Sequence, residues 1–102
     1  MSDIAKIFHA LGDVTRRDMV ERLTNAPLSV SRLAEPYAMS LTAVGQHLAI
    51  LEAAGLVTTQ KTGRVRTCAL AQPGLDALGD WLAARRSPWA QKLDALGDML
   101  DE

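Results

Sequence analysis

The 102-residue sequence predicts a mainly α-helical fold with one β-hairpin, on three observations. Apolar residues recur at steps of three and four along most of the chain, which is the spacing of one helix face. Over residues 56–70 this spacing gives way to β-branched residues on either side of Thr62-Gly63, a pattern typical of two strands joined by a tight turn. The length suits one domain, so we expect residues 1–102 to form a single domain.

Two helices are expected before residue 26. The first covers residues 3–11, where the apolar residues fall on one side, and it ends at Gly12. Asp13 follows, and its carboxylate can accept a hydrogen bond from the first turn of a second helix, from Val14 to about Asn25. Pro27 then forces a turn, because proline disfavours the helical conformation in the residue before it.

The next two helices are short and closely spaced. Ser29 can cap a third helix, over residues 30 to about 37, and Ser40 can cap the central helix, over residues 41–54. Gly55 follows at the position where a glycine commonly ends a helix in the left-handed conformation. Two short helices joined by a few residues form a helix-turn-helix, which we place at about residues 29–55.

The central helix has two distinct faces. We expect one stripe to face the core, namely Leu41, Val44, Leu48 and Leu51. The opposite face is short, mostly uncharged and able to form hydrogen bonds; it carries Thr42, Ala43, Gln46 and Ile50, with His47 on its flank. Such a face suits entry into a DNA groove, where Gln46 can pair bidentately with adenine. An ordinary amphipathic helix of a small bundle is the alternative, and His47 could equally lie at the edge of the core.

The hairpin at about residues 56–70 has the composition of a wing beside this helix. Lys61, Arg64 and Arg66 cluster at its tip, where they could neutralise DNA phosphates. The alternative is a solvated turn whose charges discourage edge-to-edge aggregation. Arg32, on the third helix, could contact the DNA backbone or lie on a solvated face. Of Arg16 and Arg17, one could reach a phosphate or pair with a nearby carboxylate.

Two further helices, at about residues 74–101, follow the hairpin. Gln72-Pro73-Gly74 should end the hairpin, and Ser87-Pro88, a cap followed by a proline, should separate the two helices. Both carry wide apolar stripes that need a cover, because exposed stripes of this size favour aggregation. We expect the N-terminal helix of a second copy to provide that cover; packing on the same chain is the alternative.

Charge, cysteine content and hydropathy limit the class of protein. The net charge is −1, divided between +2 over residues 1–70 and −3 over residues 71–102. A mildly basic body with an acidic tail fits a DNA-binding protein that presents one face to phosphate. Cys68 is the single cysteine and is expected to be a small buried side chain, with a regulatory thiol as the alternative. We see no secretory leader and no apolar run that could span a bilayer, and the single cysteine suggests a reducing compartment, so we expect a cytoplasmic protein without a membrane partner.

Three stretches, Ala10–Leu23, Leu28–Val57 and Lys61–Leu70, together resemble the ArsR-type winged-helix repressors over essentially the whole chain. The resemblance implies a symmetric homodimer that places two recognition helices in successive major grooves of a pseudo-palindromic operator in double-stranded DNA. By motif position the DNA-binding residues would be Ser40, Thr42, Ala43, Gln46, His47, Arg32, Lys61, Arg64 and Arg66. The first and last helices would form the dimer interface, through Ile4, Ile7, Phe8, Leu78, Trp81, Leu82, Trp89, Leu93, Leu96 and Leu100.

The chain departs from the metal-sensing members of that family. A thiolate site needs a Cys-x-Cys pair at the start of the third helix, where this chain has Ser29 and Ser31. The acidic residues of the last helices have no histidine partner, since the two histidines are His9 and His47. The family usually has Ser or Thr in place of Gly45. We therefore expect no metal, no cofactor and no catalytic residue.

The leading interpretation is a homodimeric transcriptional repressor. Two alternatives remain open: a winged-helix module that binds another protein, and a repressor that responds to a small organic effector at the dimer interface. The operator sequence, the effector and the choice between repression and activation are left open.

Overall fold

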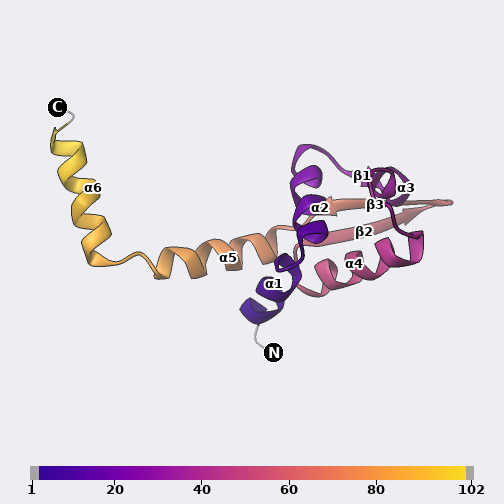
Figure 1. Cartoon of the computed structure of the whole chain (residues 1–102), viewed down its shortest axis with the longest axis horizontal. Coiled ribbons are helices and arrows are strands. Elements are labelled where there is room, and N and C mark those ends of the chain that lie inside the picture. Colours follow the sequence, from indigo (N-terminus) through magenta and orange to yellow (C-terminus); the bar gives the residue numbers. More distant parts are fainter. Residues whose placement is uncertain (1–2, 101–102) are drawn as a thin grey trace.

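The computed structural model describes residues 3–100, which form six helices and three strands (Figure 1). In chain order the elements are α1 (Asp3–Leu11), α2 (Val14–Asn25), β1 (Leu28–Ser29), α3 (Val30–Ala34), α4 (Leu41–Ala53), β2 (Val57–Thr62), β3 (Val65–Leu70), α5 (Gln72–Ala84) and α6 (Pro88–Leu100). The mainly helical fold with a β-hairpin that the sequence predicts is confirmed.

The hairpin is part of a three-stranded antiparallel sheet in the order β1-β3-β2. Its turn contains Gly63, whose φ of 63° is a conformation that glycine adopts without steric cost. Sequence analysis missed β1, which pairs Leu28 with Cys68 and Ser29 with Thr67. A strand of two residues has no alternation from which to detect it.

Helices α1–α4 and the sheet enclose one apolar core. Its fully buried large side chains come from separate elements and include Ile7, Met19, Leu33, Leu51 and Leu56. The first four lie on the apolar stripes of their helices and Leu56 lies in the turn between α4 and β2, so the periodicity of the sequence identifies most of the core correctly. The core fixes α3 and α4 against the hairpin.

Side-chain caps define where the helices start. Asp13 accepts a hydrogen bond from the Arg16 N–H at 3.0 Å, and Ser40 accepts one from the Ala43 N–H at 3.1 Å. Ser29 likewise caps α3, which ends at Ala34 rather than near residue 37. The cap residue Glu35 still has helical backbone angles (φ −49°, ψ −48°), but Pro36 has no N–H with which to continue the helical hydrogen bonds.

The start of α5 corrects one expectation. Pro73 and Gly74 lie inside the first helical turn, and the helix begins at Gln72. A proline is tolerated there because its missing N–H would have no partner in the helix. Gly74 also touches the end of α4: its N–H donates to the Gly55 carbonyl at 2.7 Å, and a Cβ would lie 2.5 Å from that oxygen. Glycine therefore allows α5 to start against α4.

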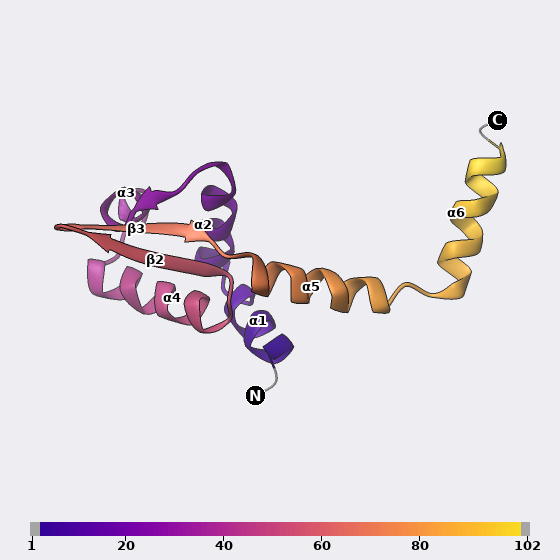
Figure 2. The same cartoon turned by 180° about the vertical axis from the view of Figure 1, so that it is seen from behind.

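The C-terminal helices extend away from this body. Figures 1 and 2 show α5 leaving the body and α6 turned across its far end. The radius of gyration is 17.5 Å, whereas a compact chain of this length has about 13 Å. No residue of α6 is buried. Among residues 3–100, no helix has both the length and the apolar character needed to cross a membrane.

Candidate nucleic-acid interface

The outer face of α4 presents short polar and small side chains to solvent. Val44, Leu48 and Leu51 are buried in the core and so fix the rotation of the helix. As a result Thr42 and Gln46 are exposed on the opposite side, while Ala43 is half-buried on the flank. The Gln46 amide can both donate and accept hydrogen bonds, so this face can read the edges of bases.

Two residues of α4 differ from the expected faces. Leu41, expected in the core stripe, is 59% exposed, because the first turn of α4 lies beyond the packed core. Ile50, expected on the outer face, is half-buried and packs against the core. Leu41 instead lines a groove of about 310 Å³ beside Gly45 of α4 and Arg66 of the hairpin. Nothing lies within 4 Å of a Cβ built on Gly45, so this side of α4 is open.

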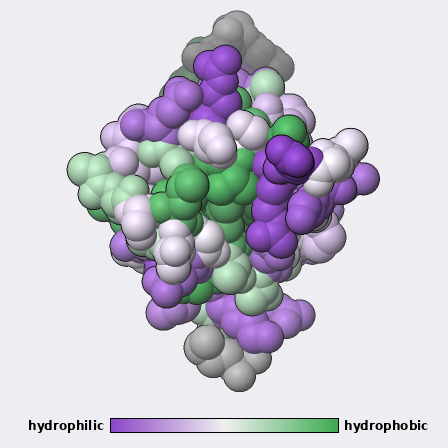
Figure 3. Space-filling view, turned by 90° about the vertical axis from the view of Figure 1, so that its right-hand side faces the viewer, coloured by the Kyte–Doolittle hydropathy of each residue, from purple (hydrophilic) through white to green (hydrophobic). Residues whose placement is uncertain are grey.

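The hairpin tip, whose sequence contains three cations, lies at the same end of the molecule as α3 and the start of α4 (Figure 1). Lys61, Arg64, Arg66 and Arg32 are all exposed. None of these four side chains forms an ion pair within residues 3–100. Figure 3 faces this end and shows strongly hydrophilic groups flanking an apolar surface. Unpaired, exposed cations in this position can meet phosphates without first breaking an internal pair.

A side-chain hydrogen bond connects the central helix to the hairpin. The Thr59 hydroxyl, on β2, donates to the Glu52 carboxylate, on α4, at 2.5 Å. Glu52 is the second-last residue of α4 and Thr59 is the third residue of β2, so the bond joins the C-terminal end of the helix to the hairpin. It restricts the position of the wing relative to the face that carries Gln46.

Arg16 is a structural residue that sequence analysis only partly recognised. It is 8% exposed and is the one charged side chain within the buried set of residues 3–100. Its Nε donates to the Ala10 carbonyl at 2.7 Å and its Nη2 to the His9 carbonyl at 3.1 Å. The guanidinium thus lies at the C-terminal end of α1, where a positive charge is favourable. The Arg16 guanidinium is thus used inside the protein, and of the two arginines after Asp13 only Arg17 is exposed.

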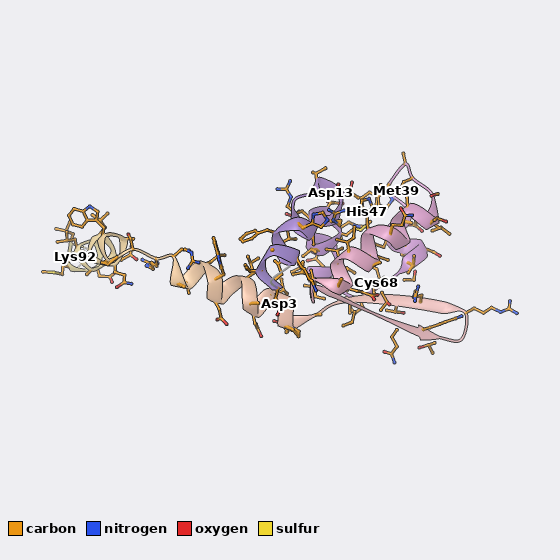
Figure 4. The ribbon with its side chains drawn as sticks, turned by 90° about the horizontal axis from the view of Figure 1, so that it is seen from below. Asp3, Asp13, Met39, His47, Cys68 and Lys92 are labelled. Atoms are coloured by element: carbon orange, nitrogen blue, oxygen red, sulfur yellow. The ribbon has the colours of Figure 1, made fainter. Side chains whose placement is uncertain are left out.

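Sequence analysis left His47 either in contact with DNA or at the edge of the core, and the structure places it at the boundary between the two. It is half-buried, and its Nδ1 is 3.2 Å from Nη1 of Arg16. Nδ1 is also 4.0 Å from the Asp13 carboxylate, and Figure 4 shows Asp13 and His47 adjacent where α2 meets α4. One ring nitrogen is therefore engaged inside the protein.

Hydrogen bonding and burial shift two pKa values near this region. The pKa of Asp13 is lowered, chiefly because the Arg16 backbone N–H donates to its carboxylate. The pKa of the Cys68 thiol is raised, first by burial and then by the negative charge of Glu52. Cys68 is a free, fully buried thiol on β3, as the sequence analysis expects of a small core residue.

The predicted dimer residues fall into two groups. Ile7 is 1% exposed and belongs to the core of its own chain, so it is not available to a partner. Ile4 and Leu78 are half-buried against the same core. Phe8 and Trp81 meet edge to face with ring centroids 4.9 Å apart, which joins α1 to α5. The remaining predicted residues are exposed, namely Leu82, Trp89, Leu93, Leu96 and Leu100.

The C-terminal helices are held by few contacts of their own. Arg85 lies 4.4 Å above the Trp81 ring, and Arg86 pairs with Asp94 across the α5–α6 turn. Ser87 caps α6 by accepting a hydrogen bond from the Ala90 N–H at 3.1 Å. Within residues 3–100, no group of three or more His, Cys, Asp or Glu side chains could hold a metal ion.

Comparison with known proteins agrees with this geometry. Residues 11–60 match the model of a helix-turn-helix domain. The HTH-type transcriptional regulator Rv2034 of Mycobacterium tuberculosis is 40% identical over 98 residues, which cover 91% of each chain. The crystal structure of the ArsR family transcriptional regulator RHA00566 is 41% identical and superposes with a TM-score of 0.81, covering 86% of this chain and 97% of that one.

A third relative shares the fold. The homodimeric winged helix-turn-helix DNA-binding domain of Mb0332 from Mycobacterium bovis is 23% identical, with a TM-score of 0.66, over 82% of this chain and 81% of that one.

Proposed function

The chain belongs to the ArsR family of winged helix-turn-helix transcriptional regulators, and from that premise we propose that it is a homodimeric repressor of a pseudo-palindromic operator. It is a DNA-binding transcriptional regulator. We assign it no catalytic role and place it in the prokaryotic cytoplasm, at the nucleoid. In this proposal α4 enters the major groove and the wing, at residues 61–66, grips the flanking backbone.

The proposal depends on one observation: the exposed side of α4 and the cations of α3 and the wing lie at the same end of the molecule. The exposed side of α4 has neutral hydrogen-bonding groups in Thr42 and Gln46, which suit base edges. Beside it, the exposed cations of α3 and the wing suit phosphates. A surface meant only for solvent would normally mix charges of both signs along α4.

Base readout is assigned to Gln46, with Thr42, Ala43 and Ser40 close to the DNA around it. The backbone contacts are assigned to Lys61, Arg64, Arg66 and Arg32. His47 supports the helix rather than contacting bases, because its Nδ1 already faces Arg16. We therefore remove His47 from the groove-facing set.

Three observations support the homodimer. The apolar side chains of α6 are exposed, with Trp89 at 70%, which is a liability in a lone chain. The extended shape also leaves α5 and α6 uncovered, and the relative from Mycobacterium bovis is homodimeric. A twofold dimer would present two α4 helices to half-sites about 34–36 Å apart, one turn of DNA.

A gel shift with the chain's own promoter region tests the proposal. At about 50 mM salt we expect a discrete complex that a tenfold excess of unrelated DNA does not remove, together with a dimer mass in sedimentation equilibrium. Weaker DNA binding by Arg64→Ala/Arg66→Ala would distinguish this function from a protein-binding module, because the same substitutions would leave the affinity of such a module for its protein partner intact. A chain that gives no shift at low salt contradicts the proposal.

A further inference from the structure

The contacts of Arg16 form a continuous connection between the two faces that the proposed function uses. On one side, Phe8 of α1 packs against Trp81 of α5, in the region assigned to the dimer. One and two residues later in α1, the carbonyls of His9 and Ala10 accept hydrogen bonds from the Arg16 guanidinium. The remaining arm of the guanidinium reaches His47, on the helix assigned to the DNA groove.

The chemistry of the Arg16–His47 contact permits one protonation state. An arginine side chain has five donors and no acceptor, so Nδ1 of His47 must accept the hydrogen bond. The ring is then neutral, with its proton on Nε2. An imidazolium carries a proton on both nitrogens and cannot accept, so the 3.2 Å contact would become repulsive.

We propose, resting on the proposed function above, that Arg16 is a positioning residue for DNA binding and that protonation of His47 at Nδ1 releases the recognition helix from it. The guanidinium is fixed by two carbonyls at the end of α1 and is almost fully buried, so it forms a rigid anchor. The neutral His47 ring joins α4 to that anchor. DNA binding therefore weakens as the solution becomes acidic.

The charged groups around His47 define where the proton would go. Asp13 lies 4.0 Å from Nδ1, so an imidazolium can turn from Arg16 toward that carboxylate. The Asp13 carboxylate also caps α2 by accepting the Arg16 backbone N–H. From α1, Lys6 and His9 face the next turn of α4, at Ile50 and Ala53. On protonation His47 loses its hydrogen bond to Arg16, which is anchored on α1, and gains an ion pair with Asp13, the N-cap of α2.

The sign of the pH effect separates this role from a direct DNA contact. Imidazole is the side chain that changes charge between pH 5 and 8. If His47 touched a phosphate, its positive form would strengthen binding at low pH. If it positions α4 through Arg16, its positive form weakens binding, by about tenfold for one lost hydrogen bond to a charged group.

The test is the affinity for the operator fragment between pH 7.5 and 5.5 at fixed ionic strength, by fluorescence anisotropy on the full-length dimer. For the wild type we expect affinity to fall by about tenfold or more. His47→Asn keeps an acceptor without a titrating proton, whereas His47→Ala removes the acceptor. We expect both variants to give flat pH profiles, with His47→Asn binding more tightly than His47→Ala.

His9→Gln is the matched control, because it removes the chain's other imidazole from an exposed position. We expect it to keep the wild-type pH profile. Dimer mass and the urea midpoint, measured at each pH, identify any loss caused by dissociation or unfolding.

Three results would overturn the inference: wild-type affinity that is constant or rises at low pH, a His47→Asn profile that follows the wild type, or equal losses in both His47 variants. Absence of wild-type binding at pH 7.5 would instead contradict the proposed function itself.

Discussion

Removal of the wing arginines should change the salt dependence of DNA binding by a calculable amount. Arg32, Lys61, Arg64 and Arg66 are exposed and form no ion pair within residues 3–100, so each can neutralise one phosphate. With four such cations in each protomer, a dimer has a slope of log affinity against log salt of about −7. Between 50 and 200 mM salt, affinity should therefore fall by about four orders of magnitude.

The double variant Arg64→Ala/Arg66→Ala removes half of these contacts. Its slope should be about −4, so the same change in salt should cost about two orders of magnitude. The measurement is fluorescence anisotropy on a labelled operator fragment at several salt concentrations. Folding should be unaffected, because both side chains project from the exposed hairpin tip and neither is part of the core.

A second double variant, Arg86→Ala/Lys92→Ala, removes the same charge from the C-terminal segment, with Arg86 in the α5–α6 turn and Lys92 in α6. Its slope should equal that of the wild type, provided that sedimentation shows the same dimer. If both double variants reduce the slope equally, only net charge matters, and the assignment of phosphate contacts to the wing is refuted. An unchanged slope in the wing variant refutes it as well.

Four further results are expected. Gln46→Ala should reduce discrimination at one base pair of each half-site by about 1–3 kcal/mol, in competition with single-base operator variants; equal losses on every sequence would contradict base readout. Asp13→Ala should lower the free energy of unfolding by about 1 kcal/mol at neutral pH through loss of the α2 cap. Because the pKa of Asp13 is lowered on folding, this contribution is present above its ordinary value of 3.8 and disappears as the pH falls further, so urea melts of the two proteins should converge in acid. Leu93 and Leu96 are 60% and 52% exposed, so Leu93→Glu/Leu96→Glu should shift sedimentation equilibrium from dimer to monomer. If the resulting monomer also melts at a lower temperature, the two side chains stabilise their own chain instead. Cys68 should react with a thiol reagent only at the rate of unfolding, since burial removes access and raises its pKa; fast labelling of the native protein would rule this out.

Local patterns in the sequence predicted the elements well because the interactions behind them span only a few residues. The caps at Asp13, Ser29 and Ser40 each bond an N–H three residues further on. Gly55 follows the C-cap of α4 with a φ of 72°, as the preference of glycine for the left-handed conformation after a helix predicts. The apolar periodicity likewise identified Val44 and the rest of the buried face of α4.

Features that depend on contacts between distant segments of the chain could not be predicted from local sequence patterns. The apolar spacing placed Leu41 in the core, yet that residue lies beyond the packed region. Ile7 has the spacing of an interface residue, yet the same chain buries it. Strand β1 exists only because Leu28 pairs with Cys68, forty residues away in sequence.

The sequence by itself determined the helices, the hairpin, the composition of the α4 outer face and the cations of the wing, because periodicity, capping and turn preferences act between near neighbours. The tertiary structure alone decided that Arg16 is internal and faces His47, a contact between residues 31 positions apart. The physical reason is that burial of a charge depends on which carbonyls and rings the folded chain brings around it, and those partners come from two other helices, α1 and α4.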